Sequence, residues 1–329
     1  MAEKLIIRID ASALKESSCL RRFYWNTISG YRSRVNTNDL EFGSAFHEFV
    51  RVMKGDPGNY AAAVKAAQDR YKVPMEIKEK KQYMTATYLT NLCISFWQEW
   101  VEKDDFETVV KDGKPLVELK FSYPYYADDQ VEVLLCGTID DICKHKHGTY
   151  ALRDYKTTSV YDSVAYLSGY LLSPQLMFYK MIVDYYGRTY PNSLFGELST
   201  KNIACFIDGV FLAGAAKPPT FKRSDVFVFN ARQMAEFEKL VNQRVMDLVA
   251  YVKQNVLPDR QGMVNGACQT VYGKCKYFNA CIQSDEIGTI SALNKHFIQA
   301  EYNPLKFGDE HQKPITVGIP SIETPIQLQ

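Results

Sequence analysis

The sequence lacks any long hydrophobic run. No stretch of about 18 apolar residues occurs among its 329 residues, so we expect no transmembrane helix and no membrane partner. The opening MAEKLIIRID also lacks the basic-then-apolar pattern of a secretory signal peptide. We therefore expect a cytoplasmic protein, from a bacterium or a virus-infected host cell.

Net charge is nearly absent as well. The chain has 39 Lys and Arg against 38 Asp and Glu, so any affinity for nucleic acid must come from a local basic face. Internal repeats and low-complexity blocks are missing, which excludes repeat architectures. A hydrophobic content of 46% is normal for a packed core, and the length allows one large domain with insertions or two small ones.

Helical periodicity dominates the first third of the chain. Apolar positions predict a helix over residues 11–29 and another from about 40 to 53. Residues 60–103 are rich in Ala, Lys, Glu and Gln, with aromatic residues at intervals of three and four. We interpret residues from about 55 to 105 as a helical insertion without catalytic motifs.

The middle of the chain changes to short β-rich runs. Three consecutive antiparallel strands are predicted, followed by two more: 116–126, 131–143, 149–157, 205–212 and 225–229. Helices are predicted over 174–187 and 234–252, and residues 303–329 lack periodicity, which indicates an irregular tail. The expected order is helices, then a sheet, then helices.

Two carboxylates and a lysine lie on the second and third predicted strands. Asp140 and Asp154 are each seven residues from His147, so a hairpin turning there would put them opposite one another. Lys156 would share their face, and Asp141 would point to the other. Close carboxylates repel unless a cation lies between them, which suits Mg²⁺ or Mn²⁺. Alone, an Asp-x-Lys pattern more often marks exposed acids near a turn.

Two motifs on predicted helices accompany this pattern. His47 follows Gly43 by one turn, and a histidine there can reach a metal, although a single such histidine is more often an ordinary, partly buried one. Gln175 and Tyr179 are four residues apart, so they point the same way and could orient substrate or water. Alone, this pair is only a helix face.

The combination resembles the RecB-type branch of the PD-(D/E)xK nuclease superfamily. The motifs occur in that family's order: G-x-x-x-H at 43–47, G-x-I-D at 137–140, D-x-K at 154–156 and Q-x-x-x-Y at 175–179. The resemblance implies an α/β fold with a mixed central sheet flanked by helices, in a single nuclease domain over residues 1–302. It also implies metal-dependent hydrolysis of DNA phosphodiester bonds.

The resemblance assigns roles to individual residues. The implied ligands of Mg²⁺ or Mn²⁺ are His47, Asp140, Asp154 and the backbone carbonyl of Tyr155. Lys156 would be the catalytic lysine, and Gln175 and Tyr179 would support the positioning of DNA. Glu118, in the strand before Asp140, matches an acidic position often seen there.

Three cysteines form a compact group near the C-terminus. Cys268, Cys275 and Cys281 have a spacing that suits zinc or an iron–sulfur cluster, and either needs a fourth ligand. By the resemblance, Cys19 supplies it and the group holds a 4Fe-4S cluster, with zinc as the alternative. The other reading is four buried free thiols. The remaining cysteines are assigned to the core: Cys93, Cys136, Cys143 and Cys205.

The function implied by the resemblance is that of an exonuclease. It would process DNA that is single-stranded or has ends, in recombination, replication or repair, with a protein partner in such a complex. Two alternatives stay open: a non-cleaving DNA-binding or scaffolding subunit, and a structure-specific endonuclease or resolvase. The intact metal-binding residues and lysine argue against the first.

Overall fold

The computed structural model describes residues 4–34, 37–72, 81–212, 214, 217–270 and 273–306. The chain forms two compact units. Unit 1 contains Met1–Arg34, Lys120–Gly137 and Ala231–Gln329, and unit 2 contains Val35–Leu119 and Thr138–Asn230. None of the described helices is long and apolar enough to cross a membrane.

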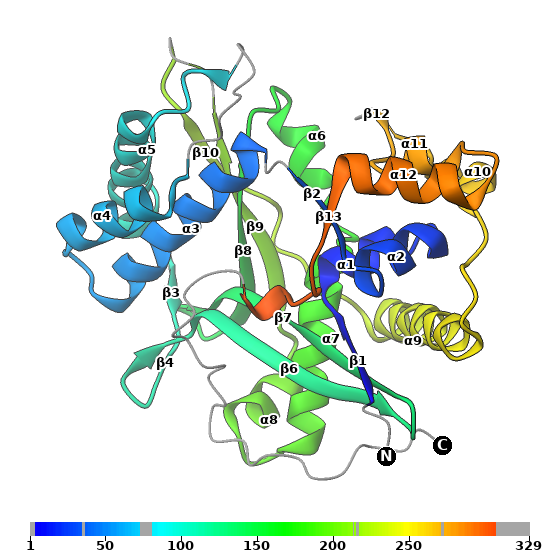
Figure 1. Ribbon diagram of the computed structural model, residues 1–329. Coiled ribbons are helices and arrows are strands. Elements are labelled where there is room, and N and C mark those ends of the chain that lie inside the picture. The colour runs from blue at the N-terminus through cyan, green and yellow to red at the C-terminus, as the bar shows by residue number, and fades with distance from the viewer. Residues whose placement is uncertain are drawn as a thin grey trace. The chain divides into compact units, whose positions relative to one another are not determined.

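Seven strands of the described chain form a mixed sheet. Its strands are β1 (Leu5–Ile9), β3 (Phe106–Thr108), β6 (Val117–Ala127), β7 (Val131–His145), β8 (Tyr150–Thr158), β9 (Ala204–Phe211) and β10 (Thr220–Arg223). The order is β1-β7-β8-β9-β10, and β3 and β6 also pair with β7. The β1–β7 and β8–β9 pairs are parallel, whereas β7–β8 and β9–β10 are antiparallel. The expected mixed sheet flanked by helices is confirmed (Figure 1).

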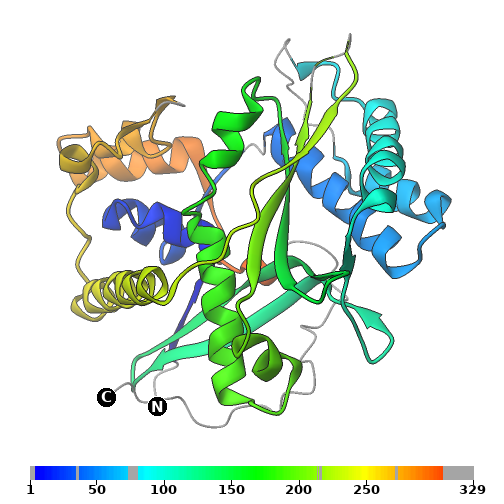
Figure 2. The ribbon, with the colours of Figure 1, turned by 180° about the vertical axis from the view of Figure 1, so that it is seen from behind.

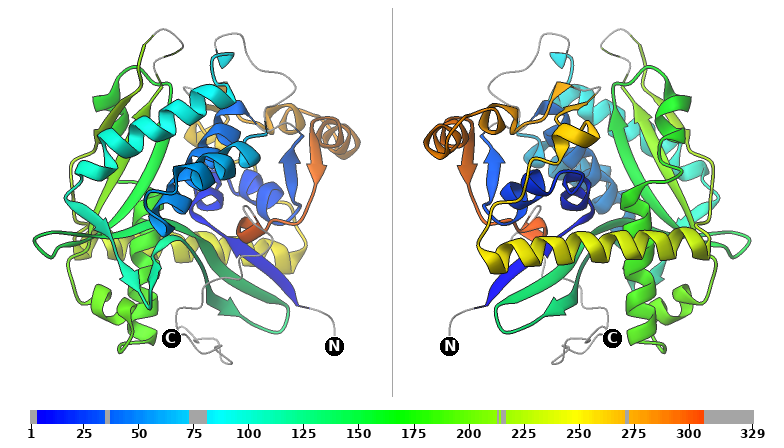
Figure 3. Two further views of the ribbon diagram at one scale, coloured as in Figure 1. Left: turned by 90° about the vertical axis from the view of Figure 1, so that its left-hand side faces the viewer. Right: turned by 90° about the vertical axis from the view of Figure 1, so that its right-hand side faces the viewer.

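Helices cover the sheet strands of unit 2. They are α3 (Asn38–Gly55), α4 (Tyr60–Arg70), α5 (Ala86–Glu99), η2 (Val101–Lys103), α6 (Ser163–Ser168), α7 (Pro174–Thr189) and α8 (Leu194–Ser199), with a small hairpin of β4 (Val110–Lys111) and β5 (Lys114–Pro115). Apolar residues of α3, α4 and α5 form one buried cluster with Tyr155 and Val210 of the sheet. Figure 3 shows these three helices side by side. Figure 2 shows α7 crossing β8 and β9 on the side away from α3. Every residue of β9 is buried, as expected for a strand covered on both faces.

Unit 1 contains both ends of the described chain. Its further elements are α1 (Ala11–Glu16), α2 (Leu20–Thr27), β2 (Tyr31–Ser33), α9 (Ala231–Gln254), α10 (Gly262–Asn265), β11 (Gln269–Thr270), β12 (Gly273–Lys274), α11 (Phe278–Cys281), α12 (Glu286–His296), β13 (Phe297–Gln299) and η3 (Pro304–Lys306). Strand β13 pairs antiparallel with β2, so segments from opposite ends of the sequence lie side by side. A small apolar core built around Trp25 and Tyr277 holds them together.

Two predicted elements differ from those observed. The helix expected over 11–29 is divided into α1 and α2, because the chain becomes extended at Cys19, which is the N-cap of α2. The strand expected over 225–229 is reduced to a single bridge between Phe227 and Cys205, and β10 forms earlier. Of the predicted tail, Pro304–Lys306 form a short 3₁₀ helix, and residues 307–329 lie outside the described residues.

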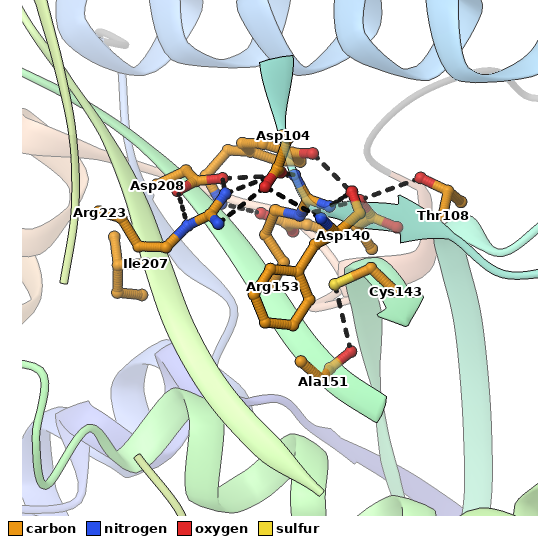
Figure 4. A network of polar contacts seen from close by, with 12 residues as sticks. Asp104, Thr108, Asp140, Cys143, Ala151, Arg153, Ile207, Asp208 and Arg223 are labelled. Atoms are coloured by element: carbon orange, nitrogen blue, oxygen red, sulfur yellow. Dashed lines mark hydrogen bonds and ion pairs between the residues drawn. The ribbon is translucent and has the colours of Figure 1, made fainter. Parts of the chain in front are cut away.

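A buried ion network ties β8 to its neighbours in unit 2 (Figure 4). The fully buried Arg153 side chain contacts Asp104 at 2.6 Å, Asp141 at 3.2 Å and Asp208 at 3.4 Å. Arg223 binds two of the same acids, Asp104 and Asp208, at 2.8 Å each. Each carboxylate therefore has a cationic partner, which a buried charge requires.

Removal of the Arg153 cation should destabilise the fold strongly. Arg153→Met leaves three buried carboxylates with too few cations, so we expect a loss of about 3–5 kcal/mol in the free energy of unfolding, measured by urea titration. Arg232→Met is the matched control, because Arg232 is 88% exposed beside Glu236; its expected change is below about 0.5 kcal/mol. Equal small losses in both variants would contradict this role for the network.

Candidate active site

The pairing of β7 with β8 positions two acidic residues side by side. The register runs from Lys144 opposite Tyr150 to Asp141 opposite Arg153, around a turn closed by the His145 N–H bonding to the Thr149 carbonyl at 2.8 Å. The next positions along the two strands belong to Asp140 and Asp154. The hairpin inferred from the sequence therefore forms, with these two carboxylates just beyond the last regular pair.

Tyr155 lies beyond the last regular pair of β7 with β8, so side chains can bond to its backbone N–H and carbonyl. Its N–H donates to Asp140 Oδ2 at 2.9 Å, and its carbonyl oxygen accepts from His47 Nε2 at 3.0 Å. His47 reaches this point from α3, and its Nδ1 donates to Glu118 Oε1 at 3.1 Å and lies 3.5 Å from Asp140 Oδ2. Both ring nitrogens face acceptors, which requires the doubly protonated imidazolium.

The acids around His47 determine its protonation. Burial alone would lower the pKa of His47, but the charge of Asp140 and the contact with Glu118 outweigh it and raise the pKa to about 9. Burial and the nearby charge of Asp154 raise the pKa of Asp140 well above its ordinary value. In the metal-free protein, protons thus compensate for the crowding of carboxylates.

Three side chains converge closely enough to bind a metal ion. One ligand atom each from His47, Glu118 and Asp140 lies within 4.8 Å of the others, and the described residues form no other such group. One imidazole nitrogen and two carboxylates are a donor set that suits Mg²⁺ or Mn²⁺. Glu118 has φ of 49°, a left-handed backbone conformation that costs energy in a non-glycine residue. This strained position carries the side chain that contacts His47.

Asp154 and Lys156 form the adjoining part of the site. Lys156 Nζ lies 2.5 Å from Asp154 Oδ2, and Asp154 Oδ1 accepts from Gln175 Nε2 at 2.8 Å. The same Gln175 nitrogen lies 2.8 Å from the Tyr179 hydroxyl, so Gln175 links Tyr179 of the same helix to this carboxylate. Burial lowers the pKa of Lys156, but Asp154 and Asp140 raise it more, and the amine stays protonated.

The structure divides the residues singled out in the sequence into two neighbouring sets. Glu118 was selected from the sequence only because it matches an acidic position often seen in the family that the motifs resemble. In the structure it belongs to the trio of possible metal ligands. Asp154 is outside that trio and contacts Lys156 and Gln175, so its role as a ligand stays a prediction. No sequence motif pointed to Tyr166 of α6, whose hydroxyl contributes to the raised pKa of Lys156.

The cysteine group lies wholly in unit 1. Cys19 is buried, and the Cys275 N–H bonds to the Cys268 carbonyl at 2.9 Å. Burial raises the pKa of Cys281 to about 11, Arg21 opposes this shift, and Cys275 and Cys19 add to it. In the described part of the chain, no cysteine belongs to a group with ligand atoms within 4.8 Å of one another. The four cysteines assigned to the core are buried: Cys93, Cys136, Cys143 and Cys205.

Comparison with known proteins identifies one family. A sequence profile described as "PD-(D/E)XK nuclease superfamily" matches residues 12–281, which include every candidate residue from Cys19 to Cys281. Curated proteins give no match. Among solved structures, the crystal structure of SSO0001 is 11% identical over 71% of this chain and 84% of that chain, with a TM-score of 0.25. The profile match carries the assignment, since so low a TM-score supports no argument.

Metal binding at His47 and Asp140 should strengthen as the pH rises. A metal ligand must lose its proton, and the pKa values of both groups are raised, so protons compete with the metal at neutral pH. We expect Mn²⁺ affinity to increase from about pH 6 to about pH 9, by up to roughly tenfold per unit for each proton displaced. Isothermal titration in buffers of different ionisation enthalpy measures both affinity and proton release.

His47→Gln is the control variant for this titration. It removes one competing proton, so the dependence on pH should become shallower. An affinity independent of pH, with no buffer-dependent heat, would show that the metal does not displace these protons.

Proposed function

Because the chain belongs to the PD-(D/E)XK nuclease superfamily, we propose that it is a metal-dependent deoxyribonuclease that hydrolyses phosphodiester bonds at the site around Asp140. The observation that carries this proposal is the convergence of His47, Glu118 and Asp140 beside a protonated Lys156. A partly buried cluster of acids with an adjacent fixed cation has the chemistry needed to bind a metal and a phosphate together.

The metal would be held by His47, Glu118 and Asp140, with the Tyr155 carbonyl on the same side and Asp154 as a further candidate ligand. When bound, Mg²⁺ or Mn²⁺ would polarise the phosphodiester and lower the pKa of a bound water. The Tyr155 carbonyl accepts a hydrogen bond from His47, so it already points to where the imidazole lies. Loss of the His47 proton would free both groups to act as ligands.

Lys156 supplies a positive charge beside these candidate metal ligands. Its Nζ is fixed by Asp154, whose second oxygen is held by Gln175. A cation fixed in this way can stabilise the negative charge that develops on the phosphate oxygens, without a cost for reorientation during the reaction. Tyr179 completes this chain of contacts through Gln175. We assign Gln175 and Tyr179 to positioning, since they act through Asp154.

We further propose that the protein is an exonuclease of the RecB-type branch, acting on DNA ends in recombination, replication or repair with a protein partner. The order and spacing of its four motifs support this branch. The non-cleaving alternative would need no fixed lysine beside a trio of metal-binding groups, so the geometry favours a cleaving enzyme.

Lys156→Ala should abolish most cleavage. Loss of a fixed charge at developing negative charge typically costs about 10²–10³ in kcat, and we expect a fall in this range on labelled single-stranded DNA with Mg²⁺ or Mn²⁺. Lys146→Ala is the matched control, because Lys146 is an exposed lysine of the same unit paired with Asp105, and it should cleave like the parent. If Lys156→Ala also cleaves like the parent, the site is wrongly assigned.

Cleavage by an exonuclease should require an end. We expect degradation of linear single strands to short products, while a covalently closed circle of the same sequence persists, as followed on a denaturing gel. Equal cleavage of the circle would favour the endonuclease or resolvase. No cleavage of either DNA with either metal would favour the non-cleaving subunit.

We also propose that Cys19, Cys268, Cys275 and Cys281 bind an iron–sulfur cluster, with zinc as the alternative. The thiols affect one another electrostatically, since Cys19 and Cys275 both act on Cys268 and on Cys281. Cationic side chains are also close: Arg21 acts on Cys281 and Arg22 on Cys268. A multi-iron cluster spaces its thiolates more widely than a single metal ion does, and positive charge beside it offsets the charge of the thiolates.

Protein purified without oxygen should be brown and contain iron if this second proposal is correct. Cys268→Ala should lose most of the iron and the visible absorption, whereas Cys93→Ala, a change in the core of unit 2, should keep both. A colourless parent protein with bound zinc would support the alternative. A parent protein free of both metals would leave four ordinary thiols and contradict the proposal.

A further inference from the structure

A cavity of about 520 Å³ lies in unit 2 beyond the ends of β8 and β9. Its lining residues include Lys81, Tyr83, Ser159, Val160, Tyr161 and Phe211. The volume falls within the range of small-ligand sites, roughly 300–1,000 Å³. Neither the family match nor the contacts of the candidate active site account for this cavity.

The cavity adjoins the candidate active site along β8. Ser159 lines it and follows Lys156 by three residues, a distance of about 10 Å along a strand. The neighbouring strand brings Phe211 beside Thr158 through the parallel register. The Tyr166 ring packs edge-on against Phe211 with 5.7 Å between the ring centroids. A polynucleotide held at Lys156 would therefore have its adjacent nucleotides at this cavity.

The described part of the lining is aromatic. Tyr83, Tyr161 and Phe211 contribute rings, and Lys81 is the one charged residue among the lining side chains that the structure describes. Lys81 already pairs with Asp39. A phosphate group would find no unpaired cation among these side chains, whereas the flat face of a nucleobase can stack on aromatic rings whatever its sequence.

Tyr161 is placed to provide such a stacking surface. Tyr161 lines the cavity and is 99% exposed, so its ring is open to a ligand. The preceding Val160 also lines the cavity and is 38% exposed. Adjacent exposed apolar side chains at a cavity indicate a binding surface more often than isolated ones do.

We propose that this cavity receives one unpaired nucleobase of the DNA strand that lies in the active site, stacked on Tyr161. The inference rests on the proposed nuclease function and defines its substrate further. A base in a duplex is paired and stacked between its neighbours, so it cannot enter without being extruded. The cavity therefore selects DNA that is single-stranded next to the scissile phosphate.

The test compares DNA strands that each lack one base, at a different position in each strand. A labelled single strand of about twelve nucleotides is bound to the protein with Ca²⁺, and fluorescence anisotropy gives the Kd for the intact strand and for strands with one abasic site at each position in turn. In the parent protein, an abasic site at one position should weaken binding by about tenfold, the loss of one stacked base. Gel analysis after each titration confirms that the strand is intact.

Two variants of Tyr161 make the test specific. Tyr161→Ala should bind the intact strand about tenfold more weakly, and the abasic site should then cause no further loss. Tyr161→Phe keeps the ring and should behave like the parent. Because the side chain is almost fully exposed, neither change should disturb folding. The proposal is overturned if Tyr161→Ala binds as tightly as Tyr161→Phe, or if the abasic effect persists in Tyr161→Ala.

Separate measurements of DNA binding and DNA cleavage distinguish a failure of this inference from a failure of the proposed function. The position-dependent abasic effect without any cleavage in Mg²⁺ or Mn²⁺ would support a base-binding cavity in a non-cleaving protein. Cleavage abolished by Lys156→Ala, without any effect of Tyr161 or of the abasic position, would support the nuclease and overturn the cavity's role.

Discussion

Successive residues of a β-strand point to opposite faces, and the register of β7 with β8 therefore decides where two sets of charges lie. With Asp141 opposite Arg153, these residues face the buried network. Asp140 and Asp154, one position further along, face the candidate active site. A slip of one residue would exchange the two faces, placing the network's arginine among the site carboxylates.

The two sets of charges are balanced in different ways. On the network side, Arg153 and Arg223 compensate three carboxylates through ion pairs that join β8 and β10 to residues of other elements. On the side of the candidate active site, the carboxylates outnumber the lysine. The raised pKa values of His47 and Asp140 indicate that bound protons offset the remaining negative charge. Tyr155 links both, because its hydroxyl bonds to Asp141 at 3.0 Å and its backbone to Asp140. The network thus holds in place the strand whose backbone contributes to the site.

Much of this arrangement could be predicted from the sequence because it depends on local periodicity. The hairpin follows from the β-rich runs on each side of His147, and the symmetric spacing of Asp140 and Asp154 gives their approximate register. Regular patterns of this kind also identify the long helices. The resemblance to a nuclease family added the order of the motifs, which spacing alone could not interpret.

The parts that could not be predicted depend on contacts distant in the sequence. Glu118 joins the site through a left-handed backbone conformation that no pattern in its strand indicates. Arg153 would pass as an ordinary strand residue, since Asp104 and Asp208 come from separate elements. The break at Cys19 separates two helices that share one apolar pattern, and it became visible only with the cap of α2. Tertiary packing determines each of these features.

The central claim is that the β7–β8 register creates a metal site, and locating a bound ion tests it most directly. Crystals grown with Mn²⁺ and measured at its absorption edge would give an anomalous peak at each bound ion. The account predicts a peak within coordination distance of His47, Glu118 and Asp140, and none in crystals of Asp140→Asn. A fully occupied ion elsewhere, with these three side chains still bonded only to one another, would contradict it.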